Sequence, residues 1–250
     1  MRTTTGVQIT AAGEALLPDA RKAIYHAEQA RLAVELALRG EGGRLRVAFV
    51  GSAALELLPR LIASYRRRFP VVELELSEET TQSALDGVAR RKLDAGLVRY
   101  PILEHGPFDL VELDADDFVL AVPARSKLAQ QPRISLPEVG DSAFVMYSAT
   151  SVPSLRAMAL LRCQHSGLSP RVVQEATQVH TILSMVGSGV GVALVPGVSK
   201  RFRTHGVKYI ALTDTPRGFR IGIALAFLRD SSNHAVARFV EHARDIARVS

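Results

Sequence analysis

The sequence predicts an α/β fold made of two successive lobes, preceded by one long helix. From Arg44 onward, short apolar runs bounded by glycine or proline alternate with longer amphipathic stretches, which is the pattern of strands alternating with helices. The alternation forms two series along the chain, and this implies two lobes. Before Arg44, a helical pattern runs from Thr10 to Arg39 and stops at the glycine-rich residues 40–43, because glycine ends helices.

The composition is that of a folded chain with a mild excess of positive charge. Two hundred and fifty residues with 47% hydrophobic content can bury one large core or two smaller ones. The net charge of +6 suits contact with nucleic acid or with an anionic ligand, but it identifies neither. The basic clusters at residues 66–68 and 90–92 lie near the carboxyl ends of predicted helices, where cations offset the helix dipole. We therefore interpret both clusters as solvated helix ends.

A single cysteine, Cys163, excludes an internal disulfide and fits a reducing compartment. It lies in an apolar helical run, which favours a small core residue over a nucleophile. No apolar signal segment follows Met1, and no apolar run reaches the length of about 18 residues that a membrane helix needs. We expect a cytoplasmic protein without membrane contact.

Residues 1–10 are short, polar and β-branched around Gly6, and they look like the end of a hairpin that has lost its partner. Thr10 is expected to cap the long helix, with Glu14 in its first turn. Two seams run along this helix, and their small residues allow close packing on more than one side. A helix cut off by glycines has no core of its own to lie on, so we favour a dimerising linker helix over a surface helix. The seams are Leu17, Ala20, Ile24, Ala27, Val34 and Leu38, and Leu16, Ala23, Ala30 and Ala37.

The first lobe is expected to open with a βαβ unit. A strand at residues 47–50 meets the turn Gly51-Ser52-Ala53, an amphipathic helix follows, and a second strand occupies residues 71–76. Thr80 or Thr81 then caps the next helix, and residues 93–98 form a third strand. Further strands are expected at residues 109–113, 117–122, 143–147, 171–174, 190–195, 209–212 and 221–228. Further helices are expected at residues 136–139, 154–165, 179–186 and 233–246, with a polar loop at 126–133.

Ligands of such units collect at the carboxyl ends of the strands, where helix amino termini present free N–H groups. Ser52 and Thr81 occupy such positions, and Arg99 follows the third strand at the same edge. Helix capping would explain the two hydroxyls equally well, and both roles are compatible because they use the same geometry. A surface salt bridge would explain Arg99 equally well.

Other chemistry finds little support in the sequence. The run GSGVGV at residues 187–192 follows a helix and precedes a strand, the reverse of a dinucleotide-binding fingerprint, so we interpret it as a helix stop. Ser52 lacks the second glycine of a nucleophile elbow. The seven histidines are scattered, and we expect neither a metal site nor a cofactor.

Four segments together are typical of one protein family. The segments are GVQITAAGEALLPDARKAI (6–24), LRVAFVGSAALELLPRLIASYRRRFPVVELEL (45–76), KLDAGLVR (92–99) and MVGSGVGVALVP (185–196). On these segments, the chain resembles the LysR-type bacterial transcriptional regulators over nearly its whole length. Within that family, the resemblance is to the branch that responds to aromatic-degradation intermediates such as muconates.

The resemblance implies two Rossmann-like lobes, similar to type II periplasmic binding proteins, with a small-molecule effector, an organic acid, between them. It assigns residues 1–10 to the remnant of a DNA-binding wing, 11–43 to the linker helix, 44–115 with 219–250 to the first lobe, and 116–218 to the second lobe. The implied effector-binding residues are Gly51, Ser52, Ala53, Thr80, Thr81 and Arg99 from the first lobe, and Tyr147, Gln178 and Pro196 from the second.

The family's winged helix-turn-helix precedes the wing, and this chain begins within the wing, so we expect DNA contact only through that missing domain. The resemblance also implies a homodimer or homotetramer without enzymatic activity. One alternative is a solute-binding protein for transport, which would need a signal peptide or a lipidation site. A second is an enzyme on the same scaffold, for which His180 and Glu79 are the candidate general bases.

Overall fold

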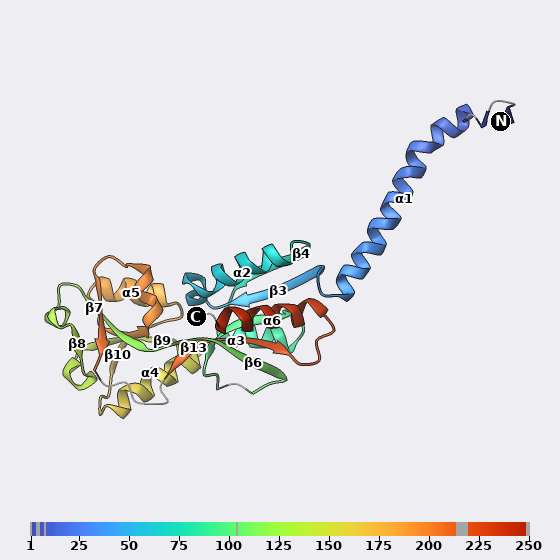
Figure 1. Ribbon diagram of the computed structural model, residues 1–250. Helices are drawn as coiled ribbons and strands as arrows, with labels where there is room; N and C mark the ends of the chain where they lie inside the picture. The colour runs from blue at the N-terminus through green and yellow to red at the C-terminus, as the bar shows by residue number, and fades with distance from the viewer. Residues whose placement is uncertain (1, 4–5, 8, 104, 214–219, 249–250) are drawn as a thin grey trace.

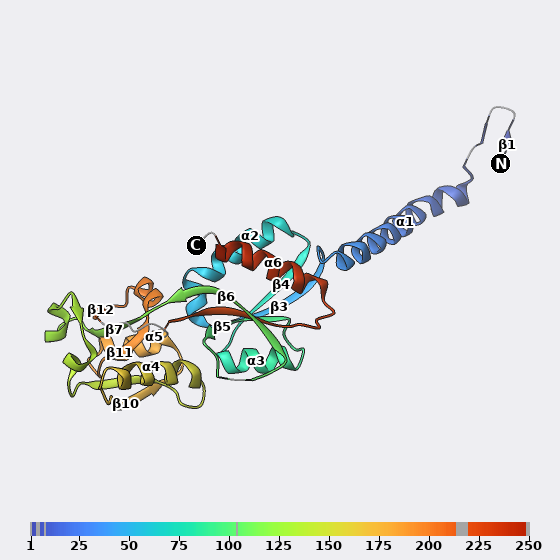
Figure 2. The same cartoon turned by 60° about the horizontal axis from the view of Figure 1, so that its bottom comes forward.

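The computed structural model describes residues 2–3, 6–7, 9–103, 105–213 and 220–248. Two lobes lie side by side, and a single long helix, α1 (Ala11–Leu38), stands away from them (Figure 1). The view in Figure 2 shows the same separation, with α1 meeting the body only at its carboxyl end, beside β3 and α6. The predicted fold class is confirmed, including the long leading helix.

The bounds of α1 follow from its capping residues. The Thr10 hydroxyl accepts a bond from the Gly13 amide at 3.2 Å, as predicted for the N-cap, and Glu14 lies in the first turn. Arg39 is the C-cap, and Gly40 follows with a φ of +69°, a conformation that glycine adopts without strain. Before α1, β1 (Arg2–Thr3) and β2 (Gly6–Val7) pair antiparallel with each other. The hairpin end is therefore present, and its two strands are each other's partners.

The first lobe is built on a five-stranded sheet in the order β4-β3-β5-β13-β6. Three strands from the beginning of the lobe are parallel, and β13 returns from the end of the chain to pair antiparallel with both β5 and β6. The strands are β3 (Gly43–Phe49), β4 (Val72–Glu78), β5 (Ala95–Tyr100), β6 (Phe108–Asp116) and β13 (Ile221–Leu228). The helices are η1 (Gly51–Leu55), α2 (Leu57–Arg68), α3 (Thr81–Ala89) and α6 (His234–Arg248).

The second lobe has a four-stranded sheet in the order β11-β7-β12-β8 and a parallel pair, β9 and β10. Backbone bonds between Val192 and the strand β9 join the two parts. The strands are β7 (Phe118–Pro123), β8 (Arg133–Ile134), β9 (Ala143–Tyr147), β10 (Arg171–Ala176), β11 (Ala193–Pro196) and β12 (Val207–Leu212). The helices are η2 (Lys127–Gln130), η3 (Leu136–Val139), α4 (Pro153–His165), α5 (Val179–Gly187) and η4 (Gly197–Phe202).

Each lobe has its own apolar core, as the two series of strands and helices predict. In the first lobe, Tyr65 packs edge-on against Phe239 with ring centroids 5.0 Å apart, which fastens α2 to α6. Cys163 is buried in the second lobe, and burial raises the pKa of its thiol to about 11. A thiol with this pKa is a poor nucleophile near neutral pH. Within the described ranges, no helix has the length and apolarity needed to cross a bilayer.

Most predicted strands differ from the structure by a few residues at one or both ends, and two of these differences have identifiable reasons. The strand expected at residues 190–195 begins at Ala193, because Val190 donates its amide to the Met185 carbonyl and completes the helix stop that the glycine run predicts. The strand expected at residues 93–98 runs over Ala95–Tyr100. Asp94 is held outside it, because its carboxylate accepts bonds from the backbone and side chain of Arg46.

Candidate functional site

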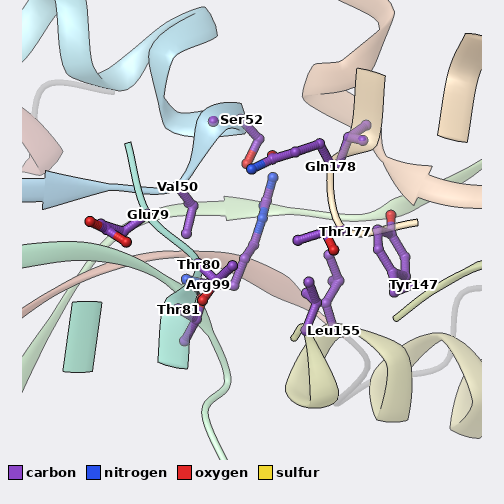
Figure 3. Close-up of a pocket in the computed structure, with 13 residues that line it drawn as sticks. Val50, Ser52, Glu79, Thr80, Thr81, Arg99, Tyr147, Leu155, Thr177 and Gln178 are labelled. Carbon is purple, nitrogen blue, oxygen red and sulfur yellow. Dashed lines mark hydrogen bonds between the residues drawn. The ribbon is translucent and has the colours of Figure 1, made fainter. Parts of the chain in front are cut away.

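A small cavity of about 30 Å³ lies between the two lobes, at the carboxyl ends of β3 and β5. Figure 3 shows residues of both lobes converging on it, with the side chain of Arg99 rising through its centre. The lining residues are Val50, Gly51, Ser52, Glu79, Thr80, Thr81, Arg99, Tyr147, Val152, Leu155, Thr177, Gln178 and Val179.

Ser52 reaches the cavity from η1, which directly follows β3. Neither helix at this junction uses it as a cap, since η1 begins after Val50 and α2 begins after Glu56, and no side chain caps either start. Ser52 is nevertheless buried, and its hydroxyl lies near the tip of the Arg99 side chain in Figure 3. The capping explanation therefore does not account for Ser52.

Gly51 allows the two lobes to approach closely beside Ser52. A Cβ atom at this position would come within 2.5 Å of a carboxylate oxygen of Glu78 and within 3.2 Å of the side-chain oxygen of Gln178. Both atoms are the ends of side chains, so a larger residue would displace the Glu78 carboxylate, crowd the Gln178 amide and change the edge of the cavity.

Thr80 and Thr81 have different roles, although the sequence cannot separate them. Thr80 is the N-cap of α3, and its hydroxyl accepts a bond from the Ser83 amide at 3.2 Å. The buried Thr81 hydroxyl accepts a bond from the backbone amide of Arg99 at 3.1 Å. β3 ends at Phe49 and offers no carbonyl at this point, so the Thr81 hydroxyl takes the place of a strand partner for the Arg99 amide.

Arg99 is the most unusual group in the cavity. Its side chain is only 4% exposed, and its Nη2 atom has no hydrogen-bond partner. Burial lowers the pKa of Arg99, while the electrostatic influence of Tyr147, Asp116 and Asp114 acts in the opposite direction. A surface salt bridge, one of the two explanations for this residue, is therefore wrong. An unpaired buried N–H of a guanidinium is costly, and it marks a place where an anion would be stabilised.

The second lobe contributes neutral groups. The hydroxyl of Tyr147 donates to the Leu194 carbonyl at 3.0 Å, so it is already satisfied inside the protein. Gln178 extends from the start of α5 towards Ser52 and Arg99, with Thr177 beside it (Figure 3). Pro196, and Ala53 of the first lobe, are two residues implied by the resemblance that are buried but do not line the cavity. Pro196 pairs with Phe118 in the sheet of the second lobe.

The sequence did not identify the apolar wall of the cavity, formed by Val50, Val152, Leu155 and Val179. It also missed Thr177, which precedes Gln178 without any motif around it.

Glu79, considered as a general base, accepts a bond from Ser83 at 2.7 Å and points away from the guanidinium of Arg99 (Figure 3). His180, the other candidate base, is exposed and lies outside the cavity lining. In the part of the chain that the structure describes, no group of three or more metal-ligating side chains occurs.

Comparison with known proteins identifies the same architecture. Residues 38–248 match the family model described as the LysR substrate binding domain. The HTH-type transcriptional regulator AlsR of Bacillus subtilis (strain 168) is 28% identical over 239 residues, which cover 96% of this chain and 78% of AlsR. The Hca operon transcriptional activator HcaR of Escherichia coli (strain K12) is 32% identical over 208 residues, covering 81% of this chain and 68% of HcaR.

Two solved structures show the same fold. CbnR, a LysR family transcriptional regulator, superposes with a TM-score of 0.82 at 23% identity, covering 98% of this chain and 83% of CbnR. The BenM effector binding domain with its effector benzoate superposes with a TM-score of 0.70 at 24% identity, covering 83% of this chain and 93% of that domain.

Proposed function

Because the chain belongs to the LysR family of transcriptional regulators, whose substrate-binding domain it contains, we propose that it senses a small carboxylate in the cavity between its two lobes. The relatives AlsR and HcaR are regulators of transcription, and the chain is accordingly a regulator and not an enzyme. They give no support to the alternative of a transport protein. A regulator of transcription would work in the cytoplasm.

The observation that carries the proposal is the unpaired Nη2 atom of the buried Arg99. A carboxylate placed there would form a charge-assisted bond and neutralise the guanidinium. Ser52 and Gln178 lie beside the tip of Arg99 (Figure 3) and offer further polar contacts from the two lobes. In BenM the effector is benzoate, a carboxylate, which is consistent with this ligand class.

We also propose that the chain forms a homodimer, or a tetramer built from dimers, through α1. Several large apolar side chains of α1 are exposed, among them Leu16, Ile24, Val34 and Leu38. The helix stands away from both lobes in Figures 1 and 2, so the described part of the chain leaves these side chains uncovered. A second copy of α1, packed along the same seams, would bury them.

Arg99→Met tests the carboxylate site, with Arg125→Met on the exposed surface of the second lobe as the matched control. Loss of one bond to a charged group should weaken carboxylate binding by roughly 10- to 100-fold. The same variant should unfold at a higher temperature than the parent without ligand, because it removes an unsatisfied buried charge. Calorimetry with acids that stabilise the parent in a thermal-shift screen gives the affinities. Undiminished binding to Arg99→Met would refute the site, and a large loss of stability would assign Arg99 a structural role.

A further inference from the structure

The cavity offers a ligand one positive charge. Among the lining residues Arg99 is the only cation, and it lies on the first lobe. The part of the lining that the second lobe supplies is uncharged: it consists of Tyr147, Val152, Leu155, Thr177, Gln178 and Val179.

Two arginines of neighbouring segments of the second lobe, Arg156 and Arg201, are already paired with protein groups. Arg156 donates to the Tyr147 carbonyl at 2.6 Å and to the Glu175 carboxylate at 2.7 Å. Arg201 forms an ion pair with Glu56 at 2.7 Å. Asp114 and Asp116 add negative potential at Arg99. A second carboxylate on the ligand would therefore lie against uncharged side chains in a negative field.

We propose that the effector is a monocarboxylate whose remaining body is uncharged, and that the uncharged wall of the second lobe selects against dicarboxylates. This inference rests on the proposed carboxylate-sensing function. Moving a carboxylate out of water is costly unless a cation and hydrogen bonds replace the water. Arg99 can replace the lost water for one carboxylate of the ligand, and the lining has no second cation for another. The resemblance to regulators that respond to muconates, which are dicarboxylates, would have suggested the opposite preference.

Two matched pairs of acids test the inference. Sorbate and trans,trans-muconate share a six-carbon diene chain and differ in one terminal group, a methyl in sorbate and a carboxylate in muconate. 4-Methylbenzoate and terephthalate make the same comparison on a ring. In calorimetry near neutral pH, the affinity of each monocarboxylate should exceed that of its dicarboxylate partner by at least about tenfold.

Thr177→Lys then adds a cation to the uncharged wall at a half-buried position, and Thr177→Met adds similar bulk without charge. Lysine should narrow or reverse the preference within each pair, whereas methionine should leave the preference as it is in the parent.

Equal or tighter binding of the dicarboxylates to the parent would overturn the inference and leave the carboxylate site standing. Loss of the preference in Thr177→Met as well as in Thr177→Lys would also overturn it, because size and not charge would then be selected. If none of the four acids binds the parent, the proposed function itself fails together with the inference.

Discussion

The hydrogen bond between the Thr81 hydroxyl and the backbone amide of Arg99 should contribute to the stability of the protein, and this can be tested without a ligand. The Leu97 carbonyl is bonded to the Val50 amide at 3.0 Å, on the side of β5 that faces β3. The Arg99 amide, two residues further on, points to the same side, because the backbone N–H and C=O groups of successive strand residues point alternately to the two sides. There β3 has already ended at Phe49, and the Thr81 hydroxyl accepts the bond instead.

Two single substitutions at Thr81 separate this bond from packing. Thr81→Val keeps the shape of the side chain and removes the acceptor, so it leaves a buried backbone N–H unsatisfied at a cost of about 1–3 kcal/mol. Thr81→Ser keeps the acceptor and removes one buried methyl group, which costs about 0.8 kcal/mol. The valine variant should therefore be the less stable of the two, although it is the more hydrophobic.

Urea unfolding followed by circular dichroism measures both free energies of unfolding. For a chain of this size, each kcal/mol lowers the melting temperature by about 2–4 °C, so thermal unfolding provides an independent measurement. A valine variant that is as stable as the parent, or more stable than the serine variant, would show that the Thr81 hydroxyl does not serve the Arg99 backbone.

Three further predictions concern α1, the contact between the lobes, and pH. Ile24→Gln combined with Val34→Gln should weaken the dimer, seen as a lower mass in light scattering at micromolar concentration; an unchanged mass would argue against α1 as the interface. Glu56→Gln should remove the ion pair with Arg201 between the lobes. Because both side chains are about half exposed, ligand affinity should change by about fivefold at most. A larger change would show that the pair acts through more than its charge. Burial lowers the pKa of His242 below its usual 6.5, so its contribution to stability is complete above about pH 6.5 and is lost as the pH falls through the lowered pKa. In His242→Gln, the free energy of unfolding should therefore depend less on pH below about pH 6.5.

The sequence predicts the elements of this fold well because their signals are local. Glycines and capping residues mark the ends of α1 and α5, and the strands read as short apolar runs. The edge of the sheet where Ser52, Thr81 and Arg99 meet is also predictable, since the carboxyl ends of parallel strands lie together.

What the sequence could not predict depends on contacts between distant segments. Thr80 and Thr81 look equivalent until the neighbouring strand β5 shows that only Thr81 reaches the Arg99 backbone. Arg99 is buried because the second lobe lies over it, and no pattern in the sequence around Arg99 indicates which distant segment lies there. Leu155 and Val179 read as ordinary core residues of amphipathic helices, because an apolar wall of a cavity has the same periodicity as a core.

The junction between α1 and the first lobe predicts how ligand binding would reach the proposed dimer interface on α1. The Arg238 side chain donates to the Arg39 carbonyl at 3.2 Å. A Cβ atom at Gly40 would lie 2.5 Å from the His234 carbonyl oxygen, so the two backbones are in close contact. These contacts hold the end of α1 against α6, and we expect α1 to move with the first lobe as one body.

A change in the width of the cavity on ligand binding should therefore displace the second lobe relative to α1. Spin labels at Glu28 in α1 and Lys208 in the second lobe, both exposed positions, should change their separation when a stabilising acid is added. Labels at Glu28 and Glu241 in α6 should keep theirs. When labelled protein exchanges subunits with an excess of unlabelled protein, nearly every labelled chain pairs with an unlabelled one, so the distances are those within a chain. A change between Glu28 and Glu241 with none between Glu28 and Lys208 would mean that α1 bends at Gly40, and that the ligand signal passes through this junction and not through the second lobe.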